Sequence, residues 1–263
     1  MSERIIVSMT SYPKRITNVG KAIYALLTKQ TRKPDEIHLW LAEPEFPNRE
    51  KDLPPDLQVI LEIDNVFLHW LPKNTYVHKR HEIFKYTKNE DLVYIFDEDV
   101  RYDDRLIETV YNDHKKYPDC IINFNTYPEH IYKGYRILYN SGGKIKEPSI
   151  YTRFFGQSMI PSKIFPKELL TDENENIRDE ICPICDESWL TPWFVYYDIK
   201  IYCERFGWGK NLTKDVNMWD GLVKYTHQKE ANGLERRDNW LLNVLNTFPQ
   251  IKEKYEKLFN YGK

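Results

Sequence analysis

The chain has 263 residues, a length that allows one large domain or two small ones with a sizeable buried core. Its 38 lysine and arginine residues nearly balance its 40 aspartate and glutamate residues, so the formal net charge at pH 7 is −2. This balance excludes the strong positive field of most nucleic-acid-binding proteins, and we expect no nucleic acid partner.

The first part of the chain predicts two strands separated by a turn and a helix. Residues 4–9 (RIIVSM) have the composition of a strand, and Pro13 favours a turn after them. Residues 18–29 predict a helix because their apolar side chains recur at helical spacing. Residues 36–42 (EIHLWLA) predict the second strand, and the proline-rich residues 43–55 predict a surface loop.

The same alternation continues as far as residue 117. Residues 66–71 (VFLHWL) predict a third strand, and residues 77–88 predict a helix after it. Residues 92–96 (LVYIF) predict a fourth strand, and residues 105–117 predict the next helix. The fourth strand consists of residues that suit a pleated, buried surface, so we expect it to be central and covered on both faces.

Three carboxylates, Asp97, Glu98 and Asp99, follow this central strand directly. In an open α/β sheet, ligands bind at the edge formed by the carboxyl ends of the strands. Three acids crowded at that edge repel one another unless a cation or a protonation event relieves the repulsion. The sequence therefore predicts a metal at the end of this strand.

The pattern is looser in the second half of the chain. Residues 120–124 (CIINF) predict a short strand, and residues 140–144 (NSGGK) predict a loop rich in turns. Residues 187–196 predict a helix, and residues 199–202 predict another strand. We expect this half to be an irregular region that completes the binding site.

Alternating strands and helices are typical of an α/β fold with a mostly parallel, Rossmann-like sheet layered by helices. We expect a single domain over residues 1–263. About residues 1–117 would form a nucleotide-binding half, and about residues 118–263 would form the rest of the site.

Four stretches of the sequence resemble one enzyme family: IIVSMTSYPKRI, KQTRKPDEIHLWLAEPEFP, YIFDEDV and CDESWL. The resemblance spans roughly residues 5–189. They are similar to the nucleotide-sugar-dependent glycosyltransferases of the GT-A fold, and among these to the bacterial family-2-like enzymes that assemble surface polysaccharides. Asp97-Glu98-Asp99 matches the DxD motif of that family. The resemblance implies a GT-A catalytic domain whose second half binds the acceptor.

The resemblance also implies an activity and a cofactor. Such an enzyme moves a sugar from a nucleoside-diphosphate sugar, here a UDP-sugar foremost, to a glycan or lipid-linked saccharide, and we expect inversion at the sugar. Mg²⁺ or Mn²⁺ held by oxygen ligands neutralises the departing diphosphate. By this resemblance Asp99 would coordinate the metal directly, and Asp97 would bind either the metal or the donor.

Further donor-binding residues follow from the resemblance. The turn Thr10-Ser11-Tyr12 would hold the base and ribose, with the Tyr12 ring and the Thr10 hydroxyl as contacts. Arg15 would reach a phosphate, or would form no more than a surface ion pair. Lys79, or one of the two residues after it, would lie near the donor.

The resemblance places the general base in the acidic pair Asp186-Glu187, with Asp186 as first choice and Glu187 as second. A carboxylate there would take the proton of the acceptor hydroxyl at the face opposite the leaving diphosphate. The alternative role of the pair is structural, as a helix cap and a first-turn acid. A late histidine, His227, would complete the metal shell, and a neutral imidazole suits Mn²⁺ better than Mg²⁺.

Two other classes of protein are compatible with acids at the edge of a sheet. A metal-dependent nucleotidyltransferase would use the same carboxylates, although the chain has no GxxxxGK[ST] phosphate loop. A non-catalytic carbohydrate-binding protein would hold a structural cation and use its aromatic residues for binding. Release of pyrophosphate would favour the nucleotidyltransferase, and hydrolysis of a nucleotide sugar would favour the glycosyltransferase over the binding protein.

The location of the protein is predicted from what the sequence lacks. No apolar stretch approaches the roughly 18 residues that a membrane-spanning helix needs, and no signal peptide pattern is present. With four cysteines that fit a reducing compartment, we expect a cytoplasmic protein. Residues 250–263 carry lysines and apolar residues at helical spacing, so they would either contact the inner face of a membrane or, as we favour, pack on the core.

Overall fold

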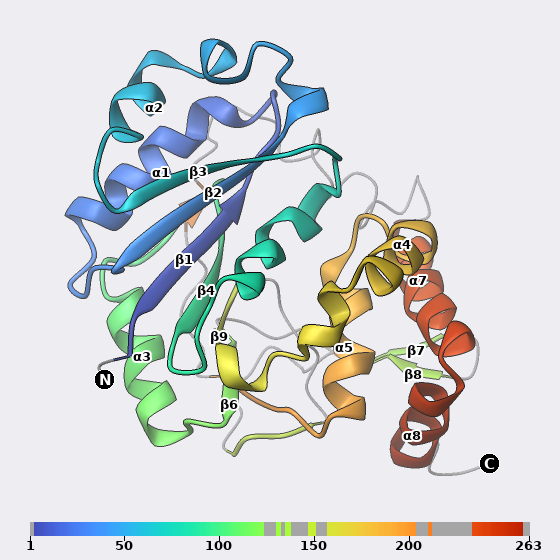
Figure 1. Cartoon of the computed structure of the whole chain (residues 1–263). Helices are drawn as coiled ribbons and strands as arrows, with labels where there is room; N and C mark the ends of the chain where they lie inside the picture. The colour runs from blue at the N-terminus through green and yellow to red at the C-terminus, as the bar shows by residue number, and fades with distance from the viewer. Residues whose placement is uncertain are drawn as a thin grey trace.

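The computed structural model describes residues 3–123, 130–132, 135–137, 147–150, 157–203, 210–211 and 233–259. Their main feature is a seven-stranded sheet with the strand order β10-β6-β9-β4-β1-β2-β3, and helices cover both of its faces (Figure 1). The predicted α/β class with a mostly parallel sheet is confirmed.

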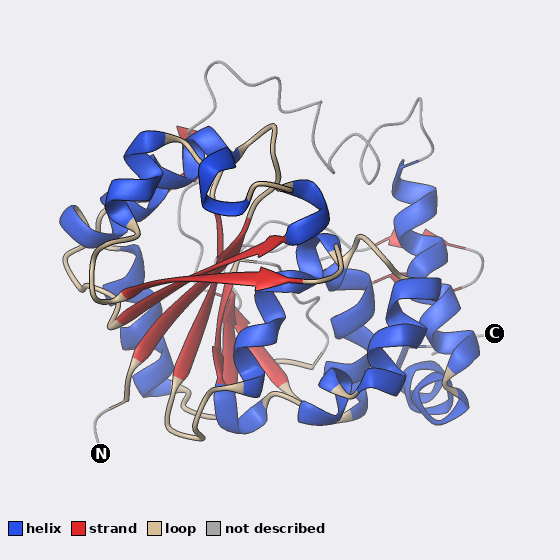
Figure 2. Ribbon diagram, turned by 45° about the horizontal axis from the view of Figure 1, so that its top comes forward, coloured by secondary structure: helices blue, strands red, loops and turns tan. Residues whose placement is uncertain are grey.

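Four parallel strands in one half of the sheet correspond to the four strands predicted for the first half of the chain. They are β1 (Ile5–Thr10), β2 (Glu36–Ala42), β3 (Val66–Leu71) and β4 (Leu92–Asp97). β1 lies between β2 and β4, and Thr10 is in register with both Trp40 and Asp97. The carboxyl ends of these strands therefore meet at one edge, and their twisted fan is visible in Figure 2.

Alternating side chains of β1 separate the core into two layers. Ile5, Val7 and Met9 pack with the helices of one face, and Ile6 packs with those of the other. The first face is covered by α1 (Ile16–Thr28), α2 (Pro55–Ile60) and α3 (Leu106–Lys116). The second face is covered by η3 (Tyr76–Lys85), α4 (Asp172–Ile181), α5 (Asp186–Tyr196), α7 (Gly233–Thr247) and α8 (Pro249–Phe259). The sheet is thus buried on both sides, as its apolar strands require.

The second half of the chain completes the sheet with β6 (Cys120–Asn123), β9 (Ser158–Pro161) and β10 (Lys200–Cys203). β9 was not predicted from the sequence. It lies between β4 and β6 and is antiparallel to both. As a result, the start of β9 lies at the edge where β4 ends.

The remaining elements are short. Two small antiparallel ladders pair β5 (Val100–Arg101) with β11 (Lys210–Asn211) and β7 (His130–Tyr132) with β8 (Tyr135–Ile137). Short 3₁₀ turns are η1 (Glu43–Glu45), η2 (Arg49–Asp52), η4 (Ser162–Ile164) and η5 (Lys167–Leu170). The predicted surface loop at residues 43–55 thus contains η1 and η2, and the predicted loop at residues 140–144 lies outside the described residues.

Residues 77–88 were predicted as an α-helix, but the structure has a 3₁₀ helix, η3, in this region. In a 3₁₀ helix side chains three residues apart lie in a row, and His78, His81 and Phe84 form such a buried row. The sheet fixes the backbone of η3 through Ser8, whose Oγ donates a hydrogen bond of 2.6 Å to the carbonyl oxygen of Arg80. The Trp40 indole in turn donates to Ser8 Oγ at 3.0 Å. The middle of η3 is therefore held directly against β1.

The last helix, α8, packs on the core of the protein. Ile251 and Tyr255 are buried in the same cluster as residues of α5. Of the two alternatives for residues 250–263, packing on the core is the one that the described part, up to residue 259, adopts. No helix among the described residues has the length and apolar character needed to cross a bilayer.

Candidate functional site

The turn after β1 and the acidic turn after β4 lie against each other at the carboxyl edge of the sheet. Ser11 Oγ donates a hydrogen bond of 3.2 Å to Glu98 Oε1, and Arg15 forms an ion pair with Asp99. The segment does not stay extended after Asp97, because residues 98–99 form a turn. Two stretches singled out in the sequence are thus neighbours in space.

Arg15 lies at an electrostatically unfavourable position for a helix. It is the N-cap residue of α1, where a cation opposes the helix dipole, and its side chain makes no capping bond. Its guanidinium instead pairs with Asp99 and lies over the ring of Tyr12, 5.8 Å from the ring centroid. Its Nε atom is buried without a hydrogen-bond partner among the described residues. The guanidinium therefore keeps an unused donor atom.

The hydroxyl of Thr10 has a structural partner. Thr10 Oγ1 donates to the carbonyl oxygen of Trp40 at 2.8 Å and so joins the ends of β1 and β2. Tyr12 is half-buried beside it. Of the predicted turn contacts, the Tyr12 ring is therefore the more available for a base or ribose.

Arg80 links the acidic turn to the start of α5. Its Nη1 atom pairs with Asp97 Oδ1, and its Nε and Nη2 atoms donate to Asp186 Oδ2 at 3.2 Å and 2.6 Å. Burial acts to lower the pKa of Arg80, but the charges of Asp186 and Asp97 outweigh burial and raise the pKa. The arginine therefore stays charged and brings together two carboxylates that are far apart in the sequence.

Lys79 points to a different part of the edge. Its Nζ atom bonds Glu45 Oε2 at 2.9 Å and Asn74 Oδ1 at 3.0 Å, near the ends of β2 and β3. Burial lowers its pKa, and the bond to Glu45 opposes that effect. Of the neighbouring residues considered from the sequence, Arg80 is the one that contacts both Asp97 and Asp186.

The two members of the acidic pair on α5 face different groups. Asp186 is buried against Arg80, whereas Glu187 lies 4.0 Å from Arg237 and accepts a 3.7 Å bond from Cys185 Sγ. The N-cap residue of α5 is Cys185, and neither acid acts as the cap. The geometry favours Asp186 over Glu187 as the reactive carboxylate.

Gln157 is a site residue that the sequence did not indicate. Its Nε2 atom donates to Asp97 Oδ2 at 2.5 Å. Gln157 precedes β9, and it reaches Asp97 because β9 runs antiparallel to β4. Gln157 could have been found from the sequence by predicting β9, but a strand of four residues is too short to show a clear alternation of apolar and polar side chains.

Negative charge remains in excess at the acidic turn. Burial, followed by the charges of Asp99 and Asp97, raises the pKa of Glu98 to about 8, although Arg15 opposes the shift. Burial and the charge of Asp97 also raise the pKa of Asp99. A further cation at this turn would therefore relieve repulsion that the arginines leave in place.

The raised pKa of Glu98 predicts a pH-dependent stability. The unfolded chain loses this proton near the ordinary value of 4.5, and the folded protein keeps it up to about 8. Between these two pH values the folded protein binds one more proton than the unfolded chain, so the free energy of unfolding falls as the pH rises. The contribution of Glu98 to stability is therefore complete below about pH 4.5 and is lost by about pH 8. We expect Glu98→Gln to gain in Tm relative to the unmodified protein as the pH rises over this window, measured by thermal unfolding in EDTA. Parallel curves, like those expected for the exposed Glu62→Gln control, would contradict this.

Asp97 and Asp99 are the residues that could hold a divalent cation. No group of three or more His, Cys, Asp or Glu side chains is placed to bind a metal in the described part of the chain. Mg²⁺, however, is commonly held by one or two carboxylates together with substrate phosphates and waters. A cation shared with a diphosphate would replace part of the contacts that Arg80 and Arg15 now make with these carboxylates. His227 lies outside the described residues.

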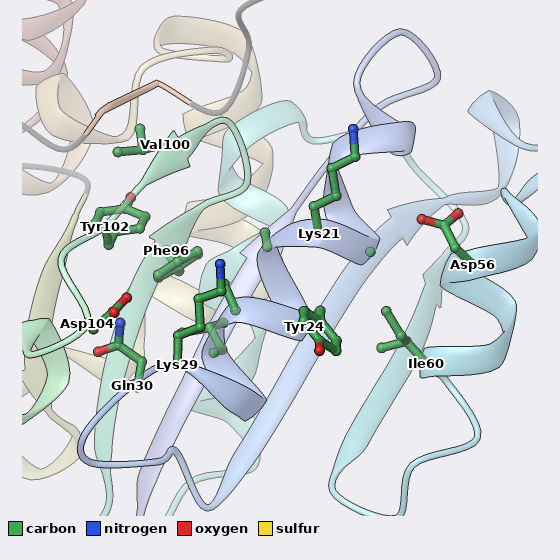
Figure 3. A pocket seen from close by; sticks show the side chains of 14 residues that line it. Lys21, Tyr24, Lys29, Gln30, Asp56, Ile60, Phe96, Val100, Tyr102 and Asp104 are labelled. Carbon is green, nitrogen blue, oxygen red and sulfur yellow. The ribbon is translucent and has the colours of Figure 1, made fainter.

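A pocket of about 450 Å³ lies beside this edge, along α1. Figure 3 places Phe96, Val100 and Tyr102 on one side of α1 and Asp56 and Ile60 on the other. None of the predicted site residues lines the pocket. We place the candidate site at the acidic turn because the charged groups with shifted pKa values converge there.

Comparisons with protein-family models and with curated proteins find no match for this chain.

Proposed function

We propose that this protein is a metal-dependent glycosyltransferase of the GT-A type. The observation that carries the proposal is the convergence of Asp97, Asp99, Arg15, Arg80 and Asp186 at the carboxyl edge of β1 and β4. This edge is where open α/β sheets bind ligands. The arrangement combines carboxylates for a cation, guanidinium groups for phosphate oxygens and a separate buried carboxylate.

The donor in this proposal is a nucleoside-diphosphate sugar, a UDP-sugar foremost. Arg15 and Arg80 offer planar donor groups that suit phosphate oxygens. Bound Mg²⁺ or Mn²⁺, held by Asp97 and Asp99, would supply positive charge to the leaving diphosphate. On donor binding, the arginines would exchange part of their carboxylate contacts for phosphate contacts, because both partners carry the same charge.

Asp186 is proposed as the general base for a glycan or lipid-linked saccharide acceptor. The acceptor oxygen forms a bond to the anomeric carbon as the bond from that carbon to the diphosphate oxygen breaks. The hydroxyl proton passes to the carboxylate of Asp186, and the diphosphate leaves with the bonding electron pair. The configuration at the anomeric carbon is inverted in a single displacement of this kind.

A thermal-shift screen of nucleotide sugars, with and without Mn²⁺, tests the proposal. A donor at about 100 times its Kd should raise Tm by about 5 °C, and only when Mn²⁺ is present. Asp97→Asn should lose this shift. The matched control is Asp103→Asn, because Asp103 is an exposed acid beyond the turn whose carboxylate pairs with Arg105.

The products then separate the proposal from its two alternatives. Slow release of a nucleoside diphosphate from the stabilising donor supports a glycosyltransferase. Release of pyrophosphate would replace the proposal with a nucleotidyltransferase. Binding without turnover in the presence of a broad set of saccharide acceptors would favour a carbohydrate-binding protein.

A further inference from the structure

A buried histidine lies behind the proposed base. His81, on η3, is 3% exposed, and its Nε2 atom is 3.6 Å from Asp186 Oδ2. This Nε2 atom has no hydrogen-bond partner among the described residues. Apolar contact limits the room around the ring, which is stacked on Phe165 at 6.5 Å between ring centroids. The free nitrogen of His81 is therefore directed at the carboxylate and is shielded from water.

The second ring nitrogen of His81 bears on which nitrogen of the imidazole carries the proton. The ring of His81 hydrogen-bonds to the backbone of His78, and this bond favours a proton on the ring atom that makes it. Burial lowers the pKa of His81 well below its ordinary value, and the charges of Arg80 and Arg178 lower it further. Since Nε2 has no hydrogen-bond partner among the described residues, these contacts favour a neutral ring with its proton on Nδ1 and a lone pair on Nε2.

A lone pair that faces a carboxylate is unfavourable while the carboxylate is ionised, and it becomes an acceptor once the carboxyl carries a proton. Arg80 Nε and Nη2 donate hydrogen bonds to the same oxygen, Oδ2. Asp186 therefore lies between a guanidinium that can only donate and an imidazole nitrogen that can accept. The other charged or titratable groups that face His81 are Arg80, Arg178 and His78.

We propose that His81 is a positioning residue that accepts a hydrogen bond from Asp186 after Asp186 has taken the proton of the acceptor hydroxyl. The inference rests on the proposed glycosyltransferase function. The proton leaves the acceptor oxygen and stays on the Asp186 carboxyl group, whose O–H donates to His81 Nε2. No proton is transferred to the imidazole, and the negative charge leaves with the nucleoside diphosphate.

Kinetics of three variants test this role. His81→Leu fills a similar volume without an acceptor and should lower kcat by about 10- to 100-fold, with unchanged affinity for UDP and Mn²⁺. His81→Gln keeps an acceptor oxygen and should recover much of that loss. His114→Leu removes another buried histidine, on α3 at the opposite face of the sheet, and should leave kcat unchanged. Equal losses in the Leu and Gln variants of His81, or an unchanged kcat in His81→Leu, would overturn the proposal.

Imidazole ¹⁵N NMR tests the same inference without any substrate. The His81 signals, assigned by their loss in His81→Gln, should belong to a neutral ring protonated on Nδ1 between pH 6 and pH 8. An imidazolium, or a ring protonated on Nε2, would overturn the proposal whatever the activity is. A neutral Nδ1–H ring in a protein that turns over no nucleotide sugar would instead defeat the glycosyltransferase function, and the role of His81 in transfer with it.

Discussion

Replacing Asp186 with Asn is expected to lower sugar transfer by about 10²–10⁴-fold while leaving donor affinity nearly unchanged. The amide oxygen can still accept the hydrogen bonds of Arg80, so the local structure is retained, but an amide cannot take a proton from the acceptor. Calorimetric titration with the donor and Mn²⁺, paired with turnover measurements on the same variant, checks both parts of this expectation.

Glu187→Gln is the matched comparison for Asp186→Asn. Glu187 lies in the same helical turn but faces Arg237, and its loss should have the smaller effect on turnover. If Asp186→Asn retains transfer and Glu187→Gln loses it, the base is one residue further along the chain. If both variants remain active, the pair serves only as first-turn acids of α5.

Asp99→Asn is expected to abolish turnover and to weaken metal-dependent donor binding, with the fold intact. The substitution keeps the shape of the side chain but removes the charge that a cation would need. It removes both the ion pair with Arg15 and the like-charge repulsion from Asp97, and because these two losses oppose each other, Tm without ligand should not fall by much. The measurements are calorimetry of the donor with Mn²⁺ and thermal unfolding without it.

The control for Asp99→Asn is again the exposed Asp103→Asn, which should bind and turn over the donor normally. Full activity of the unmodified protein in excess EDTA would contradict a metal-dependent reaction. In that case Arg15 and Arg80 alone would neutralise the negative charge of the diphosphate.

The sequence was most informative where its apolar pattern was strong. The strands β1 to β4 were predicted to within one residue at either end, because each is a run of strand-forming apolar residues. β1 and β4 are buried on both faces, whereas the edge strand β3 is only partly buried. The position of Asp97 and Asp99 at the edge of the sheet followed from the position of β4. Their proximity to the turn after β1 was implied only by the family resemblance, which assigned both segments to donor binding.

The rest of the site depends on contacts that no local pattern encodes. Arg80 reaches Asp97 and Asp186 because η3 is a 3₁₀ helix, and its three-residue rows were not distinguished from α-helical spacing. Arg15 begins a helix that it is badly suited to cap, and the helix predicted from apolar spacing began two residues too late, at residue 18 instead of Ile16. His81 entered the sequence analysis only as one of the two residues after Lys79, because its contact with Asp186 depends on burial. Gln157 carries no sequence signal of its own, since its position comes from an unpredicted strand.

The antiparallel strand β9 has a consequence for the order in which this sheet can assemble. β10 and β6 join the other four strands only through β9, which follows both β4 and β6 in the chain. The sheet therefore cannot grow strand by strand as the chain proceeds. Gln157 meets Asp97 across 60 residues, and contacts that close long loops are formed slowly. The Gln157 contact to Asp97 therefore depends on the pairing of β9 with β4, whereas Arg80 and Asp97 are only 17 residues apart in the chain.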